Sequence, residues 1–358
     1  MGKEKWYIEE SALDDYQYVI YLKGIDKSFI VKGCAGSGKT NLALWQTNKI
    51  ASSNNGSYYF IVFTKALRKF IDDGLQLDEI VIDQSRVLHY HQWKKRSYPK
   101  ADYIIVDEVQ DFGKDEIQRF VNAANKALIF FGDSSQQLYK WLKPTVMTME
   151  EISVFTNLKL SELTFNHRLP KKIARVAQHF NNDDESLVDR CKKRGGNKPY
   201  KLIASSWENQ MDRITTIIEE NEYTDVGILF ISGQKVKEAY QYYNRNNFRV
   251  EGKYDIQYPD DILFNLNFQS ENPKILTFAS AKGLQFEAVF IPDCSTKISG
   301  DRVKSFYVAM TRTYQDLYFL SYNGFTGLIN EVPEQLFEKI DNDYSPSFDD
   351  NFDDDIPF

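Results

Sequence analysis

The segment that most constrains this fold is glycine-rich and runs from Gly33 to Thr40 with the sequence GCAGSGKT. It satisfies the pattern G-x-x-x-x-G-K-[ST], follows the apolar run 29–31 and precedes a helical pattern that starts at Asn41. Its glycines allow successive backbone N–H groups to face an anion, while Lys39 supplies a charge for the β and γ phosphates of a nucleotide. The segment predicts a strand–loop–helix unit that binds ATP, with Thr40 as a ligand of Mg²⁺. A glycine-rich turn without a nucleotide is the alternative, but it would not require every fixed position of the pattern.

Short apolar runs of the kind that form buried parallel strands recur along the whole chain. They cover residues 29–31, 58–63, 103–106, 127–131, 200–204, 226–231, 274–277, 288–291 and 317–322. Helical patterns, such as 234–244 and 303–311, separate some of them. The alternation predicts an α/β protein with two lobes, each built on a parallel sheet, at residues 1–162 and 163–340.

The charge of the chain is distributed unevenly. Lys and Arg number 44 against 51 Asp and Glu, which gives a net charge of −7. Residues 341–358 hold seven Asp and neither Lys nor Arg, so the rest of the chain is neutral and a nucleic-acid partner is not excluded. Because this acidic tail has few apolar anchors, we expect it to be disordered.

The sequence carries no sign of secretion or of a membrane span. The first ten residues lack an apolar signal core, and no run of about 18 apolar residues follows. The cysteines Cys34, Cys191 and Cys294 lie far apart, which is typical of reduced thiols. We therefore expect a cytoplasmic protein without a membrane partner.

Two adjacent carboxylates follow the apolar run 103–106. Asp107 and Glu108 stand where α/β folds place their ligands, at the carboxyl end of a strand. We expect Asp107 to bind Mg²⁺ and Glu108 to act as the general base for an attacking water. The alternative is an acidic loop that caps the next helix, although Asp111 is available for that role.

The segment DEVQD at 107–111, taken with the glycine-rich loop, resembles the paired nucleotide motifs of superfamily 1 helicases of the UvrD/Rep type. Further matches occur in the order of that family: LDDYQ at 13–17, GDSSQQLY at 132–139, NHR at 166–168, TFASAKGLQF at 277–286 and YVAMTR at 307–312. The resemblance implies two RecA-like domains and an ATP-dependent translocase or helicase that moves 3′ to 5′ along single-stranded DNA. The competing hypothesis is a DNA-stimulated ATPase switch that recruits a nuclease or another subunit of a complex without processive movement.

The resemblance also assigns roles to individual residues. Gln136 would sense the γ phosphate, and Arg168 and Arg312 would reach it from the second lobe as arginine fingers, although a lone arginine is more often a surface residue. The catalytic set is Lys39, Glu108, Gln136, Arg168 and Arg312. The nucleotide-binding set is Gln17, Gly33, Gly36, Gly38, Lys39, Thr40, Asn41, His167, Gly283 and Gln285.

Three positions depart from the family pattern and bear on nucleotide selectivity. His167 replaces the tyrosine that stacks on adenine, Gln285 replaces the glutamate that contacts the ribose, and Ala279 replaces a histidine. Only nine residues separate Trp93 from Tyr103, so one of the inserted domains with which larger family members grip duplex DNA is missing. We expect the protein to unwind duplex poorly without a partner.

Aromatic and polar residues of the matching elements predict a track for single-stranded DNA, since aromatic faces stack on any base. The candidates are Phe63, Thr64, His91, Trp93, Tyr139 and Trp141. Nearby lysines and arginines, such as Lys65, would contact phosphates. Burial in the core is the alternative for the aromatic members, above all for Phe63.

The last six residues, DDDIPF, resemble the acidic tip of bacterial single-stranded-DNA-binding protein. That resemblance implies docking on the repair and replication proteins that recognise such a tip. The residues that would bind are Asp353, Asp354, Asp355, Ile356, Pro357 and Phe358. A solubility tail, a grafted fusion peptide and an intramolecular role on the DNA track remain as alternatives.

Overall fold

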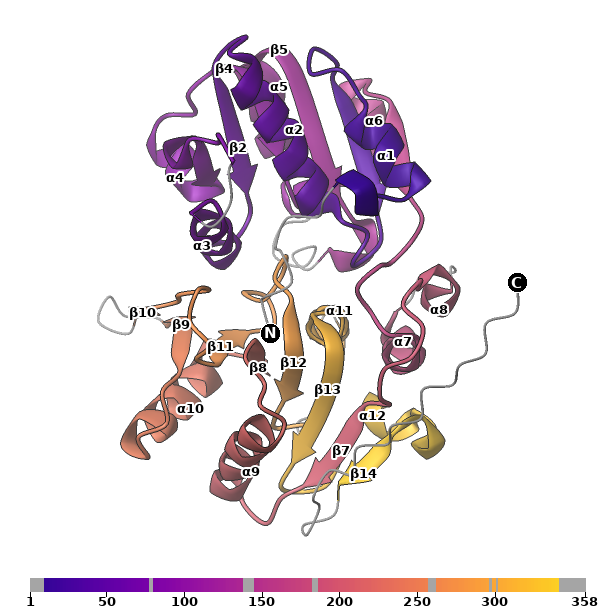
Figure 1. Ribbon diagram of the computed structural model, residues 1–358, viewed down its shortest axis with the longest axis vertical. Coiled ribbons are helices and arrows are strands. Elements are labelled where there is room, and N and C mark those ends of the chain that lie inside the picture. Colours follow the sequence, from indigo (N-terminus) through magenta and orange to yellow (C-terminus); the bar gives the residue numbers. More distant parts are fainter. Residues whose placement is uncertain are drawn as a thin grey trace.

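The structure is a computed structural model that describes residues 10–76, 80–137, 145–181, 186–256, 262–295, 298–300 and 302–340. These residues form two α/β lobes, one above the other in Figure 1, each built around its own sheet. The predicted α/β class with predominantly parallel sheets is confirmed. The acidic tail at 341–358 lies outside the described residues. None of the described helices combines the length and apolar character needed to cross a bilayer.

Lobe 1 contains a six-stranded sheet whose strand pairs are all parallel, in the order β3-β2-β4-β5-β1-β6. Its strands are β1 (Phe29–Gly33), β2 (Tyr58–Val62), β3 (Val87–His89), β4 (Ala101–Val106), β5 (Ala124–Gly132) and β6 (Leu160–Leu163). The four apolar runs of this half predicted β1, β2, β4 and β5. The edge strand β3 escaped prediction because it is only three residues long, and β6 because two of its four residues, Ser161 and Glu162, are polar. The division predicted at residues 162 and 163 falls within β6.

The helices of lobe 1 cover both faces of this sheet (Figure 1). They are α1 (Asp15–Tyr21), α2 (Lys39–Ser53), α3 (Lys65–Gly74), α4 (Tyr90–Lys95), α5 (Lys114–Ala123) and α6 (Met149–Thr156). Helix α2 begins after Gly38, whose φ of 83° is readily reached only without a side chain. Helix α3 begins directly after its capping residue Thr64, whose Oγ1 accepts the N–H of Leu67 at 3.0 Å. Both helices therefore start at residues that were predicted to bind ligands.

Lobe 2 contains an eight-stranded sheet in the order β10-β9-β11-β8-β12-β13-β7-β14. Its strands are β7 (Tyr200–Ile203), β8 (Val226–Phe230), β9 (Glu251–Asp255), β10 (Ile262–Phe264), β11 (Lys274–Thr277), β12 (Phe286–Ile291), β13 (Thr313–Ser321) and β14 (Glu338–Ile340). All its strand pairs are parallel except β9 with β10, an antiparallel pair at one edge. The five predicted runs correspond to β7, β8, β11, β12 and β13.

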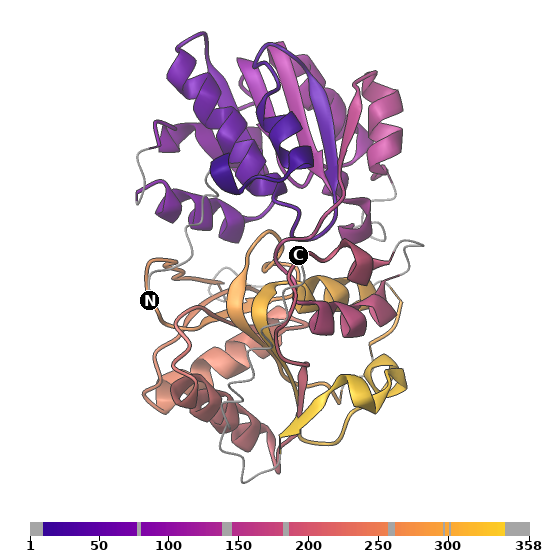
Figure 2. The same ribbon diagram turned by 45° about the vertical axis from the view of Figure 1, so that its right-hand side comes forward.

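Among the described residues, six α-helices accompany the second sheet. They are α7 (Lys171–Ala177), α8 (Leu187–Arg190), α9 (Trp207–Glu220), α10 (Gly233–Arg245), α11 (Arg302–Met310) and α12 (Leu328–Glu331). The helical patterns at 234–244 and 303–311 predicted α10 and α11 to within one residue at each end. Figure 2 shows α7 and α11 at the top of lobe 2, close to lobe 1.

A hydrophobic core cluster runs through both lobes and joins them. It contains Val31 and Leu67 from lobe 1 together with Leu284 and Phe306 from lobe 2. A Cβ added at Gly283 would lie 2.7 Å from Leu67 Cδ2, so the backbone of lobe 2 touches helix α3 directly. The carboxyl ends of β1, β4 and β5, where parallel sheets place their ligands, consequently face the second lobe.

Candidate active site

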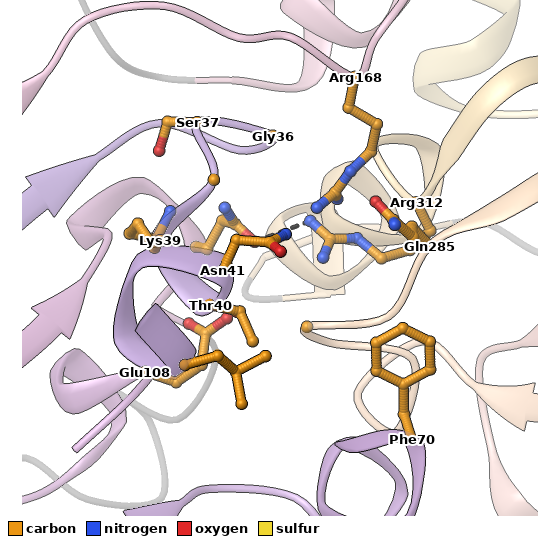
Figure 3. A pocket seen from close by; sticks show the side chains of 14 residues that line it. Gly36, Ser37, Lys39, Thr40, Asn41, Phe70, Glu108, Arg168, Gln285 and Arg312 are labelled. Carbon is orange, nitrogen blue, oxygen red and sulfur yellow. Dashed lines mark hydrogen bonds between the residues drawn. The ribbon is translucent and has the colours of Figure 1, made fainter. Parts of the chain in front are cut away.

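A cleft lies between the lobes and receives residues from both (Figure 3). Lobe 1 lines it with the glycine-rich loop, the start of α2, Glu108 and Gln136. Lobe 2 contributes Arg168, Arg312 and the backbone around Gly283. The lining residues are Gly36, Ser37, Gly38, Lys39, Thr40, Asn41, Leu44, Phe70, Glu108, Gln136, Arg168, Gly283, Gln285 and Arg312.

The glycine-rich loop curls around the amine of Lys39. Lys39 Nζ donates to the carbonyls of Gly33 at 2.8 Å and Cys34 at 2.9 Å, and lies 3.9 Å from Asp133 Oδ2. Gly36 has a φ of 70°, and a side chain there would collide with Asn166 Oδ1 at 2.4 Å. The loop is thus preformed and pressed against the segment that leads to Arg168.

Thr40 and Asp107 provide the oxygen atoms that a hard cation requires. Thr40 Oγ1 donates to Asp107 Oδ2 at 2.6 Å at the carboxyl end of β4. Burial and the neighbouring Glu108 raise the pKa of Asp107 to about 7. A hydroxyl and a carboxylate at one edge fit Mg²⁺, which takes its remaining ligands from phosphates and water.

Glu108 is held in a strained backbone conformation as an ionised base. Its φ of 57° is uncommon for a residue with a side chain, and such strain often accompanies function. Burial alone would raise its pKa, but the charges of Lys282 and Lys39 and a 2.6 Å hydrogen bond from Gln110 lower it to about 2. The carboxylate is therefore ionised at neutral pH, but it is a weak base as long as these cations lie beside it.

Lys282 crosses from lobe 2 into the carboxylate cluster of lobe 1. Its fully buried Nζ bonds Asp111 Oδ2 at 2.5 Å, donates to the carbonyl of Gln136 at 2.6 Å and lies 3.4 Å from Glu108 Oε2. Sequence reasoning did not single out this lysine. The available signal was its place before Gly283 in the TFASAKGLQF element.

Arg312, like Lys282, extends from lobe 2 and donates a hydrogen bond to Gln136 of lobe 1. Its side chain is 2% exposed, and Nη2 donates to Gln136 Oε1 at 2.8 Å while Nε donates to the carbonyl of Val308. The amide nitrogen of Gln136 in turn donates to Asp133 Oδ2 at 2.6 Å. Gln136 thus connects the phosphate side of lobe 1 to an arginine of lobe 2.

Arg168 has an N–H group without a hydrogen-bond partner among the described residues. Nη1 donates to the carbonyl of Thr311 at 3.3 Å, whereas the buried Nε has no hydrogen-bond partner among the described residues. Burial and the nearby Arg312 lower the pKa of Arg168 to about 9. Figure 3 shows the two guanidinium groups side by side at the cleft, across from Lys39. This arrangement can stabilise negative charge that develops on a phosphoryl group.

Gln17 and His167 lie behind the loop and are not among the residues that line the cleft. Gln17 Nε2 donates to the carbonyl of Ser37 at 3.0 Å, and its Oε1 accepts the N–H of Asp14. His167 Nε2 pairs with Asp14 Oδ2 at 2.7 Å, and its N–H bonds the carbonyl of Gly36. Gln17 therefore contacts the loop through its side chain and His167 through its backbone, while both side chains bond Asp14.

The candidate DNA contacts fall into different environments. Phe63 is half-buried against Phe112, at 5.1 Å between ring centroids, and His91 is exposed on α4. Trp93 is fully buried, stacks on Phe120 at 4.9 Å and donates from Nε1 to the carbonyl of Pro99.

The DNA-contact prediction for Trp93 is therefore wrong, because both the face of its ring and its N–H are used inside the core. Tyr139, Trp141 and the tip residues at 353–358 lie outside the described residues.

The comparisons with known proteins agree with this geometry. The AAA domain family matches residues 22–141, about a third of the chain. A protein named "Probable DNA helicase" from Mycoplasma pneumoniae is 27% identical over 294 residues, covering 77% of this chain and 53% of that protein. "ATP-dependent DNA helicase Rep" from Buchnera aphidicola is 23% identical over 251 residues, covering 62% and 38%.

Both of these relatives are named as DNA helicases. The chain spans about half the length of the first relative and less of the second. Among solved structures, the C-terminal domain of a possible DNA helicase from Lactobacillus has a TM-score of 0.38 at 17% identity, covering 48% of this chain and 98% of that one. At this TM-score the likeness carries no argument.

Proposed function

We propose that this protein is a cytoplasmic, Mg²⁺- and ATP-dependent motor that translocates 3′ to 5′ along single-stranded DNA. The observation that carries the proposal is that Arg168 and Arg312 of lobe 2 line the same cleft as Lys39, Thr40 and Glu108 of lobe 1. Hydrolysis then depends on how the lobes are placed, so a cycle of nucleotide binding and release can drive their relative movement.

The residues divide the chemistry between them. Lys39 and the loop amides hold the β and γ phosphates, and Thr40 and Asp107 would hold Mg²⁺, which offsets phosphate charge when bound. Glu108 accepts the proton of the attacking water, while Gln136 and the arginines orient and neutralise the transferring group. Gly283 and Gln285 would flank the sugar, since both line the cleft.

Lys282 sets the resting state of this machinery. Its amine pairs with Glu108 and Asp111, both of lobe 1, and thereby ties lobe 2 to lobe 1. Water activation needs Glu108 free of that cation, so a movement that withdraws Lys282 while Arg168 and Arg312 stay in the cleft would raise the hydrolysis rate. Binding of DNA across both lobes is suited to produce such a movement.

A group of basic residues from both lobes supports the nucleic-acid part of the proposal. We call it the ridge; its members are Lys65 on α3, His89 and His91 at the start of α4, and Lys253 on β9. Lys253 on β9 donates to Ser280 at 3.1 Å, and burial together with the nearby Lys65 lowers its pKa. Burial lowers the pKa of His89 to about 4, and His91 and Lys65 are among the cations that add to this effect. Cations from both lobes thus gather where α3, α4 and β9 meet, as phosphate binding requires.

We further propose that the tip at 353–358 recruits the motor to repair or replication proteins that recognise single-stranded-DNA-binding protein. A terminal aromatic residue and carboxylate, preceded by a run of Asp, suit an apolar pocket with a basic rim. The competing function remains a DNA-stimulated switch that recruits a nuclease or another subunit without processive movement.

The test is steady-state ATP hydrolysis by the full chain with and without single-stranded DNA, beside a Glu108→Gln variant. We expect strong stimulation by DNA in the unmodified protein. The variant should bind nucleotide but hydrolyse it about 10²- to 10⁴-fold more slowly, the usual contribution of a general base. Hydrolysis that ignores DNA, or a variant as active as the parent, would contradict the proposal.

A further inference from the structure

A densely basic surface lies on lobe 2, away from the ridge described above. Residues 171–198 contain eight Lys and Arg against four Asp and Glu, in a chain whose net charge is −7. Three of those four acids, at 183–185, lie outside the described residues. We call this surface the basic face; its members are Lys171, Lys172, Arg175, Arg190, Lys192, Lys193, Arg194 and Lys198.

Helix α7 and segment 190–198 hold the basic face together. The N–H of Lys171 bonds the carbonyl of Lys193, which joins the helix to the segment. The segment turns at Gly196, where φ is 83° and an added Cβ would lie 2.7 Å from Pro170 at the start of α7. Figure 1 places α7 and α8 on one flank of the molecule, whereas α3 and α4, which carry the ridge, lie on the opposite flank.

Much of this charge has no acidic counterpart among the described residues. Lys172, Arg175 and Arg194 are exposed and form no ion pair within the described part of the chain. Lys193 donates to the carbonyl of Tyr314 at 2.7 Å, and Lys192 lies over the ring of Phe165 at 3.6 Å. A polyanion that bound here would meet exposed cationic side chains that are not already paired with described acids.

We propose that the occupant of the basic face is the chain's own acidic tail, residues 341–358. The last described strand, β14, pairs in parallel with β7, which directly follows the basic segment. Lys198 of the basic face already pairs with Glu338 of β14 at 3.2 Å. The start of β14 therefore adjoins the basic segment, and the tail follows Ile340, which lies opposite Leu202, two strand positions further along.

The reach and charge of the tail fit this role. Eighteen residues can span up to about 60 Å, more than the roughly 40 Å diameter expected of one lobe. Seven Asp without a Lys or Arg match the sign of the basic face. Tethering raises the local concentration of the tail to the millimolar range, so even weak individual ion pairs suffice.

A nucleic-acid strand suits the basic face less well. Single strands are held by aromatic side chains that stack on bases. Two aromatic rings that adjoin this surface each lie under one of its lysines: Phe165 under Lys192 at 3.6 Å and Tyr314 under Lys193 at 5.6 Å. Phe165 is also met edge-on by Tyr16, with ring centroids 5.6 Å apart. The basic face therefore offers charge while its lysines occupy these rings, as suits an acidic peptide.

Binding of the tail to the basic face would also affect the cleft, because the two are connected by hydrogen bonds. The N–H of Asn166 bonds the carbonyl of Arg190 at 2.8 Å, and the N–H of Lys192 bonds the carbonyl of Asn166 at 2.9 Å. Segment 166–168, which ends in Arg168, thus lies between the basic segment and the glycine-rich loop. A docked tail restrains that segment and keeps the tip from other proteins until it is displaced.

The test is zero-length carbodiimide cross-linking of the full chain, which joins a carboxylate to a lysine amine in direct contact, read by mass spectrometry. We expect cross-links from tail Asp to Lys171, Lys172, Lys192 or Lys193. They should disappear at about 0.5 M salt, where the Debye length is only about 4 Å. A mixture of isotope-labelled and unlabelled protein should show that the links form within one chain. Links to Lys65, Lys94 or Lys95, links between chains, or no links at all would overturn the proposal.

Two matched triple variants sharpen the test. Lys172→Glu with Arg175→Glu and Arg194→Glu should reduce the cross-links about tenfold, because each exposed cation becomes a repelling charge. The control, Lys100→Glu with Arg245→Glu and Arg302→Glu, changes equally exposed residues elsewhere and should leave the tail links to Lys171, Lys192 and Lys193 unchanged. Equal losses in both variants would contradict the proposal. So would weaker oligonucleotide binding in the first variant than in the control, which would mark the basic face as a nucleic-acid surface.

None of these readouts needs ATP hydrolysis. Failure of the docking proposal and failure of the motor proposal are therefore distinguishable.

Discussion

Lobe 1 holds its nucleotide residues by contacts within the lobe, whereas lobe 2 holds its cations by contacts across the cleft. Lys39 bonds two carbonyls of its own loop, and Thr40 bonds Asp107. Arg312 and Lys282, by contrast, bond Gln136, and Lys282 also reaches Asp111. Lobe 1 is thus organised to bind nucleotide, while the contribution of lobe 2 varies with the distance between the lobes.

This difference between the lobes shows how one protein can bind nucleotide with one lobe and control its hydrolysis with the other. A group fixed within lobe 1 acts in every state of the cleft. A cation supplied by lobe 2 acts only when the lobes approach correctly, which is the condition for coupling hydrolysis to movement. The predictions below break or sharpen that division.

The largest effect should come from the arginines of lobe 2. Arg168→Ala or Arg312→Ala should lower the hydrolysis rate about 10³-fold, as removal of an arginine finger does, and change nucleotide affinity much less. Lys39→Ala should instead weaken nucleotide binding about 10- to 100-fold, the usual worth of hydrogen bonds to a charged group.

Single-turnover hydrolysis and nucleotide titration separate the two effects, with the exposed Arg245→Ala as control. If the arginine variants lost affinity as strongly as Lys39→Ala, the division between the lobes would fail.

Lys282→Met should cost about 3–5 kcal/mol of unfolding free energy, because it leaves buried carboxylates without their cation. Glu108 has a lowered pKa in the folded protein, so its ion pairing adds stability above its ordinary pKa, and that stability is lost as the pH falls towards about 2. In the variant, burial dominates and protonation of Glu108 becomes favourable. The loss should therefore be largest near neutral pH and smaller in mild acid.

Urea unfolding at neutral and mildly acidic pH measures this loss. Lys201→Met is the control, since its partner Glu334 is exposed and stays solvated when left alone. A loss that did not change with pH, or one that Lys201→Met reproduced, would remove the argument for a charged connection between the lobes.

Trp93→Phe tests the corrected role of that residue. Loss of the bond to Pro99 and of part of the ring should cost about 1–2 kcal/mol of unfolding free energy and leave affinity for single-stranded DNA unchanged. His91→Ala, at an exposed site on the ridge, should lower that affinity while stability stays nearly constant. Fluorescence anisotropy with a labelled oligonucleotide and urea unfolding provide both readouts; the reverse pattern would restore Trp93 to the DNA track.

The smallest effect concerns the thiols. Burial raises the pKa of Cys34 to about 11 and that of Cys191 to about 12, so both stay protonated and inert at pH 8. We expect iodoacetamide to modify neither in the native protein and both in urea, as read by mass spectrometry. Rapid native labelling of Cys34 alone would show that the glycine-rich loop opens within lobe 1 itself.

The sequence predicted the parts of the fold that local chemistry determines. Continuous apolar runs predicted the central strands, and the glycine-rich loop was placed between β1 and α2 because its pattern is defined by backbone chemistry. The three-residue strands β3, β10 and β14 carry too few side chains to show periodicity. They are set by tertiary pairing instead.

The candidate site likewise contains residues that local sequence predicts and residues whose role depends on tertiary packing. Site residues that belong to a recognisable local pattern, such as Lys39 in the glycine-rich loop and Glu108 after an apolar run, could be predicted from the sequence. The role of Lys282 arises only when lobe 2 packs on lobe 1 and brings its amine to Asp111, 171 residues away. Trp93 was misjudged because alternation and composition do not reveal which ring is enclosed by Phe120.

The most direct test of the motor proposal is the rate of ATP hydrolysis by the full chain as the length of single-stranded DNA is increased. A motor that steps along the strand spends more time bound on longer strands. Its hydrolysis rate at saturating DNA should therefore rise with length and then level off. A recruitment switch would reach its full rate on the shortest strand that fills the binding site, and a rate independent of length beyond that point would contradict translocation.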